Sequence, residues 1–199
     1  TTVGGDYSAA LVGSARAHYG ARVPLVRFDA HRIPFRDQCF DAVVLYEAIY
    51  YLESPEVFAA EASRVIRRGG RLILCTANKD LPDFNPSPHS YRYFSPPDFA
   101  KLLAPAGFSV TCYADCAVDY GSVKAKLLSF VKRMLIRMDL MPKSMTGKKL
   151  FRRIVFGKLV PMPHELTNEI CSYVRPESIN CSESNRTHKV IFAVGHRTS

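Results

Sequence analysis

The sequence of 199 residues contains no tryptophan, no Cys-x-x-Cys pair and no long apolar run. A membrane-spanning helix needs roughly 18 or more consecutive apolar residues, and no stretch of this chain approaches that length. The first ten residues, TTVGGDYSAA, lack the basic start and apolar stretch of a secretory signal peptide. We therefore expect no membrane-spanning helix and a cytoplasmic location.

Paired cysteines and metal-binding histidines are also missing. The cysteines occur singly, several of them within strand-like apolar runs, and they are predicted to be reduced thiols in the core, at positions 39, 75, 112, 116, 171 and 181. The six histidines show no ligand spacing. The sequence therefore predicts no metal site.

Acidic residues are nearly absent from one segment. Residues 121–160 contain eleven Lys or Arg and a single acid, Asp139, so this segment carries a charge of +10, whereas the whole chain has a formal net charge of +9. The rest of the chain, with 16 basic and 17 acidic residues, sums to −1. The basic character thus belongs to one local surface and not to the whole fold.

The first half of the chain alternates apolar runs of strand length with helical stretches, which is typical of an α/β sheet. The run FDAVVLY at 40–46 is almost continuously apolar and suits a strand buried on both faces. Glycines after basic residues at 67–70 predict the end of a helix that Pro55 begins. We expect strands ending at residue 5 and over 21–28, 40–46, 71–76, 108–117 and 189–195, and helices over 8–19, 55–68 and 95–107.

About seventy residues between the last two expected strands interrupt this alternation. Apolar residues from Val123 to Met138 recur at helical spacing between basic residues, which predicts an amphipathic basic helix. The expected organisation is an α/β core over 1–120, a basic helical insertion over 121–187, and a last core strand with a tail over 188–199.

Five short segments occur in a characteristic order: VGGDYS at 3–8, DA at 29–30 with PF at 34–35, FDAVV at 40–44, YL at 51–52, and RV at 64–65 followed by GGRL at 69–72. Together they resemble the class I S-adenosylmethionine-dependent methyltransferases. The resemblance covers roughly residues 1–117. It implies a doubly wound, Rossmann-like α/β sheet that is mostly parallel, with an antiparallel last strand, and S-adenosylmethionine as the cofactor.

The resemblance implies a cofactor site in the first part of the chain. Asp6, next to Tyr7, takes the position of the acid that accepts hydrogen bonds from both ribose hydroxyls, a task that suits a carboxylate. Asp29 and Ala30 take the position that contacts the adenine edge, and Tyr46 begins the segment beside the methyl donor. From the residues alone, Asp6 also suits a helix cap and Asp29 also suits a turn before Pro34.

Acceptor chemistry is expected around Glu47 and Tyr50, which the resemblance places past the methyl donor. Either side chain can orient or deprotonate an acceptor, and plain packing is the alternative for both. The proline-rich loop after the fifth family strand adds His89, Tyr91 and Arg92 as candidates for contact with a polar acceptor. Its alternative role is that of a stiff surface loop.

The family's first strand and its glycine-rich loop have no counterpart among these residues, so we expect a longer chain that supplies them before Thr1. An alternative takes Gly4, Gly5 and Gly13 as a dinucleotide-binding loop with Asp29 as the ribose acid, as in a nicotinamide-dependent oxidoreductase. That arrangement leaves no room for a third strand and its helix before FDAVV.

The predicted function is methyl transfer from S-adenosylmethionine to a small-molecule or lipid-like acceptor. The alternative is a methyltransferase-like module without catalysis that works through its basic surface. Such a surface suits peripheral contact with an anionic membrane or an acidic partner. Nucleic acid is disfavoured as a partner, because the basic residues lack interleaved stacking aromatics.

Overall fold

The computed structural model describes residues 2–118, 134, 165, 167, 169–170 and 172–198. The chain divides into two compact units, Thr1–Val118 with Glu177–Ser199, and Asp119–Pro176. Only the first is described below. The predicted basic helix and most of the basic segment at 121–160 lie outside the described residues.

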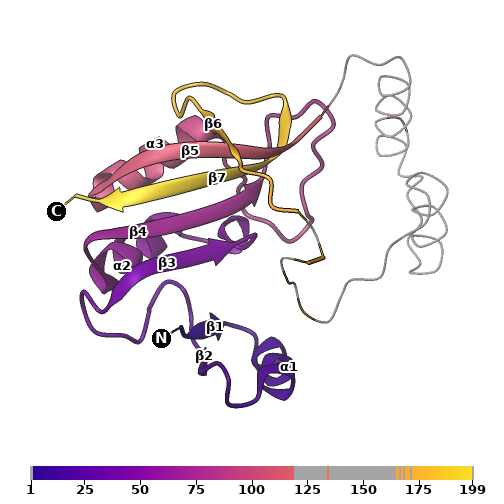
Figure 1. Cartoon of the computed structure of the whole chain (residues 1–199). Helices are drawn as coiled ribbons and strands as arrows, with labels where there is room; N and C mark the ends of the chain where they lie inside the picture. Colours follow the sequence, from indigo (N-terminus) through magenta and orange to yellow (C-terminus); the bar gives the residue numbers. More distant parts are fainter. Residues whose placement is uncertain are drawn as a thin grey trace. The chain divides into compact units, whose positions relative to one another are not determined.

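A small parallel sheet forms at the beginning of the chain. Strands β1 (Gly4–Asp6) and β2 (Leu25–Arg27) pair in parallel, and helix α1 (Ala9–Tyr19) connects them (Figure 1). The Ser8 side chain caps this helix by accepting a hydrogen bond from the Leu11 amide. A Cβ at Gly5 would lie 2.0 Å from the Phe28 ring, so the small sheet needs glycine there.

A second sheet has five strands in the order β3-β4-β7-β5-β6. Strand β3 pairs in parallel with β4, whereas β7 is antiparallel to both of its neighbours, β4 and β5. Strands β3, β4 and β5 therefore run in one direction, and the expected antiparallel last strand is confirmed. The strands are β3 (Phe40–Tyr46), β4 (Ile66–Ala77), β5 (Phe108–Ala117), β6 (Glu177–Ile179) and β7 (His188–Arg197).

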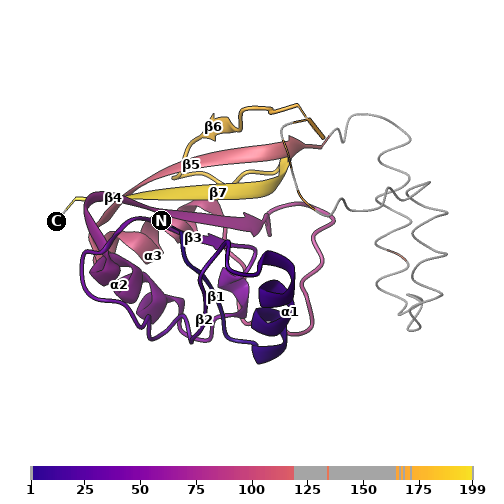
Figure 2. The ribbon, with the colours of Figure 1, turned by 60° about the horizontal axis from the view of Figure 1, so that its bottom comes forward.

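Helices α2 (Pro55–Val65) and α3 (Pro96–Leu103) cover one face of the five-stranded sheet (Figure 2). Each begins with a proline, whose missing amide proton costs nothing in the first turn. Short 3₁₀ turns precede α2 and follow α3, at η1 (Ile49–Tyr51) and η2 (Ala104–Ala106). The core lies between these helices and the sheet, and its buried members include Phe58, Val65, Leu72, Leu74, Phe99, Leu103 and Ile191.

The expectation that β3 is buried on both faces is wrong. Val44 and Tyr46 are 60% and 67% exposed, whereas Val43 and Leu45 pack against the core. The helices cover only the face that carries Val43 and Leu45. Among the described strands β3 pairs only with β4, so its other edge and its outer face lack a neighbour there.

The predicted helix end at 67–70 is also wrong. Helix α2 ends at Val65, and the two arginines and two glycines lie inside β4. Gly69 has a positive φ of 75°, and the register between β3 and β4 shifts between Phe40 and Ala42. A glycine after basic residues thus marks an irregular strand start here, which local sequence cannot distinguish from a helix end.

The core unit resumes at Glu177, earlier than the boundary expected at 188, because β6 pairs with β5. None of the helices in the described part of the chain is long and apolar enough to cross a membrane.

Candidate functional site

Three acidic residues stand where parallel strands end. Asp6 is the last residue of β1, Asp29 lies just beyond β2, and Glu47 directly follows β3. Strands β1 and β3 both run from left to right in Figure 1, so these carboxylates lie at corresponding ends of the two sheets. In open α/β sheets the carboxyl ends of the strands form the usual ligand-binding edge.

Asp6 both supports the backbone and offers capacity for a ligand. Its Oδ1 accepts a hydrogen bond of 2.7 Å from the Ser8 amide, which fixes the turn into α1. A carboxylate has about four acceptor positions, so this turn leaves acceptor capacity on the exposed side chain. Arg27 anchors the same turn to β2, because its Nε donates to the Tyr7 carbonyl over 2.9 Å.

Asp29 is held by His31, a residue that sequence reasoning missed. The Asp29 Oδ1 accepts from the His31 amide (2.9 Å) and lies 2.6 Å from His31 Nδ1. These hydrogen bonds, that from the backbone first, lower the pKa of Asp29. His31 Nε2 accepts from the Ser54 amide over 3.2 Å, so Nδ1 carries the proton of a neutral ring.

His31 thereby joins the end of β2 to the N-terminus of α2. The spacing Asp-x-His was a usable signal, because an aspartate readily accepts a bond from the amide two residues on. Ala30, beside Asp29, packs against the core.

Glu47 has an unusual backbone conformation and two side-chain neighbours. Its φ is 50°, and its amide donates to the Cys75 carbonyl over 2.9 Å. The buried Tyr50 hydroxyl donates to Glu47 Oε2 over 2.9 Å, and Cys75 Sγ lies 3.9 Å from Oε1. The structure thus brings the two predicted catalytic candidates together.

The two side chains next to Glu47, Tyr50 and Cys75, both have raised pKa values. Burial, followed by the hydrogen bond to Glu47, raises the pKa of Tyr50. Burial also raises the pKa of Cys75 to about 12. Tyr50 and Cys75 therefore stay protonated near neutral pH, so neither of them can act as a base there.

Tyr46, expected beside the cofactor, is an exposed residue at the end of β3. The adjacent Cys75 thiol, followed by partial burial, raises the pKa of Tyr46. Its side chain therefore lies next to Cys75 and Glu47, and its phenol ring is exposed to solvent at the carboxyl end of β3.

The three loop residues that were expected to contact the acceptor, His89, Tyr91 and Arg92, do not lie together in the structure. The Tyr91 amide donates to the Tyr50 carbonyl over 2.8 Å, so the backbone of Tyr91 lies beside that of Tyr50. Arg92 instead turns toward Glu56 of α2, at 3.5 Å, and His89 is exposed in the loop. Tyr93, which sequence reasoning missed, stacks on Tyr50 with ring centroids 4.4 Å apart. The alternation in Tyr-Arg-Tyr was the available signal, because side chains of an extended segment point to opposite sides.

The site thus offers three kinds of group to a ligand. Its carboxylates can accept hydrogen bonds from adjacent hydroxyl groups of a bound molecule, the Tyr50 hydroxyl holds Glu47 in place, and Tyr46 exposes an aromatic ring. Residues 1–74 match a family model described as "Methyltransferase domain". This match contains Asp6, Asp29, Glu47 and Tyr50.

Two curated relatives are similar in sequence over part of the chain. A demethylmenaquinone methyltransferase of Mycolicibacterium paratuberculosis is 37% identical over 73 residues, which cover 37% of this chain and 30% of the relative. The O-methyltransferase cnsE of Penicillium expansum is 33% identical over 114 residues, which cover 51% of this chain and 41% of the relative. The matched region thus spans less than half the length of either relative.

A solved structure matches the whole chain. It is a SAM-dependent methyltransferase from Thermotoga maritima, with a TM-score of 0.60 and 14% identity, and the match covers 100% of this chain and 73% of that one. At this identity the likeness concerns the fold, and it confirms the predicted Rossmann-like α/β architecture.

Proposed function

We propose that this chain, which matches the methyltransferase-domain family model over residues 1–74 and has the class I methyltransferase fold, transfers a methyl group from S-adenosylmethionine to a small-molecule or lipid-like acceptor. The observation that carries the proposal is the position of three carboxylates, Asp6, Asp29 and Glu47. Each stands at the carboxyl end of a parallel strand within the matched region.

The residues at the ends of β1 and β2 suit the nucleoside part of the cofactor. Asp6 accepts hydrogen bonds from the ribose hydroxyls, since only one of its acceptor positions is used by the Ser8 amide. Asp29 and the Ala30 backbone hold the adenine edge. The bonds from His31 keep the Asp29 carboxylate ionised and oriented, and they leave acceptor capacity on a side chain that is 49% exposed.

Glu47 is the proposed catalytic residue. S-adenosylmethionine supplies an activated methyl group that is open to in-line displacement. Glu47 takes the proton from the acceptor's nucleophilic atom. Oε1 is the oxygen for this task, because Oε2 accepts the 2.9 Å bond from Tyr50 whereas Oε1 accepts from the Cys75 thiol, a weak donor, at 3.9 Å. Tyr50 is a positioning residue, which fixes the carboxylate so that it needs no reorientation during the reaction.

An acceptor with apolar surface is supported by the surroundings of Glu47. Val44 and Tyr46 expose their side chains on the outer face of β3, and Tyr91 is exposed beside Tyr50. The names of the two relatives, a demethylmenaquinone methyltransferase and an O-methyltransferase, are consistent with an organic acceptor of this kind.

Cofactor titration tests the first half of the proposal. We expect saturable binding of S-adenosylmethionine that Asp6→Ala and Asp29→Ala each weaken by about tenfold or more, because each removes a charged hydrogen-bond acceptor. Asp41→Ala is the matched control, since Asp41 lies in the same matched region but pairs with Arg67 at the other end of β3. Equal binding of the cofactor by the wild type and all three variants would show that Asp6 and Asp29 do not contact it.

Product analysis tests the second half. Incubation with cofactor and a cell extract should yield a product that is heavier by one methylene group, and Glu47→Gln should suppress it. Cofactor binding without any methylated product would contradict the proposed transfer.

The basic segment supports a second proposal, peripheral contact with anionic membranes, because residues 121–160 carry a charge of +10. The expected result is co-sedimentation with phosphatidylserine vesicles that salt weakens and that Asp6→Ala leaves unchanged. Binding to these vesicles in the absence of any cofactor binding would favour the non-catalytic module.

A further inference from the structure

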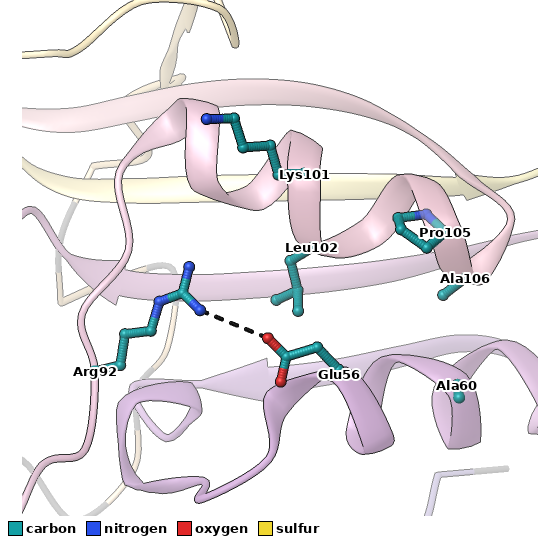
Figure 3. Close-up of a pocket in the computed structure, with 7 residues that line it drawn as sticks. All are labelled: Glu56, Ala60, Arg92, Lys101, Leu102, Pro105 and Ala106. Carbon is teal, nitrogen blue, oxygen red and sulfur yellow. Dashed lines mark ion pairs between the residues drawn. The ribbon is translucent and has the colours of Figure 1, made fainter.

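A surface pocket of about 290 Å³ lies between α2, α3 and the loop that carries Arg92 (Figure 3). It is formed by α2, α3, η2 and one loop residue. The lining residues are Glu56, Ala60, Arg92, Lys101, Leu102, Pro105 and Ala106. Its volume is at the lower end of the range for ligand-binding pockets.

The pocket combines an apolar floor with an excess of positive charge. Four of its residues are apolar, and Arg92 and Lys101 together outweigh the single acid, Glu56. In Figure 3 the Arg92 guanidinium and the Glu56 carboxylate face each other beside Leu102, while the Lys101 amine extends away from them at the rim. A ligand with one negative charge and a short apolar part matches this composition.

Arg92 is held in place but not strongly neutralised. Its guanidinium lies 4.9 Å from the centroid of the fully buried Phe94 ring, which orients it by a cation–π contact. The ion pair with Glu56 is long, at 3.5 Å, and both side chains are at least half exposed. Such a surface pair contributes little free energy, so another carboxylate can replace Glu56 at low cost.

We infer that this pocket binds a small organic carboxylate, whose charged group takes the place of Glu56 on Arg92 and whose apolar part packs on Leu102 and Pro105. The guanidinium group presents a planar fork that matches a carboxylate bidentately. The carboxylate of Glu56 already marks a place beside Arg92 where such a group fits.

A ligand in the pocket affects the candidate site through the backbone of the loop around Arg92. Arg92 lies between Tyr91, whose amide binds the Tyr50 carbonyl, and Tyr93, whose ring stacks on Tyr50. Tyr50 in turn holds Glu47. A ligand that fixes Arg92 therefore also fixes the segment that packs against Tyr50, although binding itself requires neither the cofactor nor methyl transfer.

The test is an NMR titration of the full chain with hexanoate, and with hexanol and hexylamine as uncharged and cationic controls. We expect saturable shifts of amides around Arg92 and Lys101 with a dissociation constant on the order of 1 mM, as suits a ligand of this size. The backbone amide signal of Tyr50 should shift in the same titration. Hexanol and hexylamine should bind at least about tenfold more weakly, because neither has the carboxylate that forms a bidentate ion pair with a guanidinium.

Three variants make the test specific. Arg92→Gln should abolish hexanoate binding, and Glu56→Gln should strengthen it, because the competing carboxylate is gone. Arg67→Gln is the control, since Arg67 is a similarly exposed arginine that pairs with Asp41 elsewhere on the unit. Equal binding of hexanoate and hexanol, or unchanged binding by Arg92→Gln with a wild-type spectrum, would overturn the inference. Loss of S-adenosylmethionine binding would not.

Discussion

The hydroxyl of Tyr50 donates a 2.9 Å hydrogen bond to Oε2 of Glu47, and it does so from a side chain that is only 8% exposed. The rigid ring therefore sets the direction of the carboxylate at the end of β3. Tyr93 stacks on the same ring from the loop that follows β4. The orientation of Glu47 thus depends on two segments that are far apart in the sequence.

Tyr50→Phe removes this bond and keeps the ring. A hydrogen bond to a charged group contributes about 1.5–3 kcal/mol, so we expect kcat to fall by roughly tenfold or more while the dissociation constant of the cofactor stays the same. The measurement is steady-state kinetics together with cofactor titration. Tyr51→Phe is the control, because Tyr51 is a half-exposed neighbour. A loss of cofactor binding in Tyr50→Phe would place Tyr50 in the cofactor site instead.

The positive φ of Glu47, 50°, predicts a specific order of stability among variants. Glu47→Gly and Glu47→Ala both lose the side chain, but only glycine adopts this conformation without strain. We expect the glycine variant to be more stable than the alanine variant by about 1 kcal/mol in the free energy of unfolding. Urea denaturation measures the difference. A more stable alanine variant would mean that Glu47 does not have this backbone conformation in solution.

The lowered pKa of Asp98 predicts that the free energy of unfolding decreases in acid. Burial acts to raise its pKa, but hydrogen bonds from Lys79 and Ser95 outweigh it and lower the pKa from 3.8 to about 2. A carboxyl whose pKa is depressed on folding stabilises the protein above its unfolded pKa and loses that effect as the pH falls through its folded pKa. The effect of Asp98 should therefore be complete above about pH 4 and absent below about pH 2.

Asp98→Asn provides the measurement. The wild type should exceed this variant by about 2 kcal/mol in the free energy of unfolding at neutral pH, which is the value that the pKa difference implies. The difference should shrink as the pH falls from 4 toward 2. A difference that does not depend on pH would show that Asp98 acts as a neutral cap for α3 only.

Arg64 binds the segment before β3 to α2. Its guanidinium donates to the side chains of Glu61 and Asp37 and to the carbonyls of Ile33 and Phe35, over 2.7–2.8 Å. Lysine cannot reproduce this fork of donors. We expect Arg64→Lys to lower the urea midpoint clearly, whereas Arg67→Lys, at the exposed pair with Asp41, leaves it nearly unchanged. Equal midpoints for the two variants would contradict a structural role of the Arg64 fork.

Some elements were predictable because their signals are local. The strands at Phe40–Tyr46 and Phe108–Ala117 have the predicted bounds, since apolar runs between turn residues mark both ends. Pro55 begins α2 for the same kind of reason, and Ser95 with Asp98 forms the box that begins α3. The glycines at 69 and 70 misled the prediction, because a positive φ serves a helix end and an irregular strand equally well.

The roles assigned to Asp6, Asp29 and Glu47 stay predictions, although each acid stands at the end of its strand as expected. The contact of Tyr50 with Glu47 is local, since three residues separate them. The links from Tyr93 to Tyr50 and from His31 to Ser54 join distant segments, so a local pattern can mark Tyr93 or His31 but cannot identify the partner.

The sequence by itself determined the α/β class, the order of the main strands and helices other than β6, and the acids that follow the strands, because periodicity, capping and turn chemistry act over a few residues. Only the tertiary structure decided that β7 lies between β4 and β5, that the outer face of β3 is exposed, and that Arg92 turns away from Tyr91 toward Glu56. These features depend on which surfaces of distant segments pack together, and that choice minimises the free energy of the whole unit and not of any one segment.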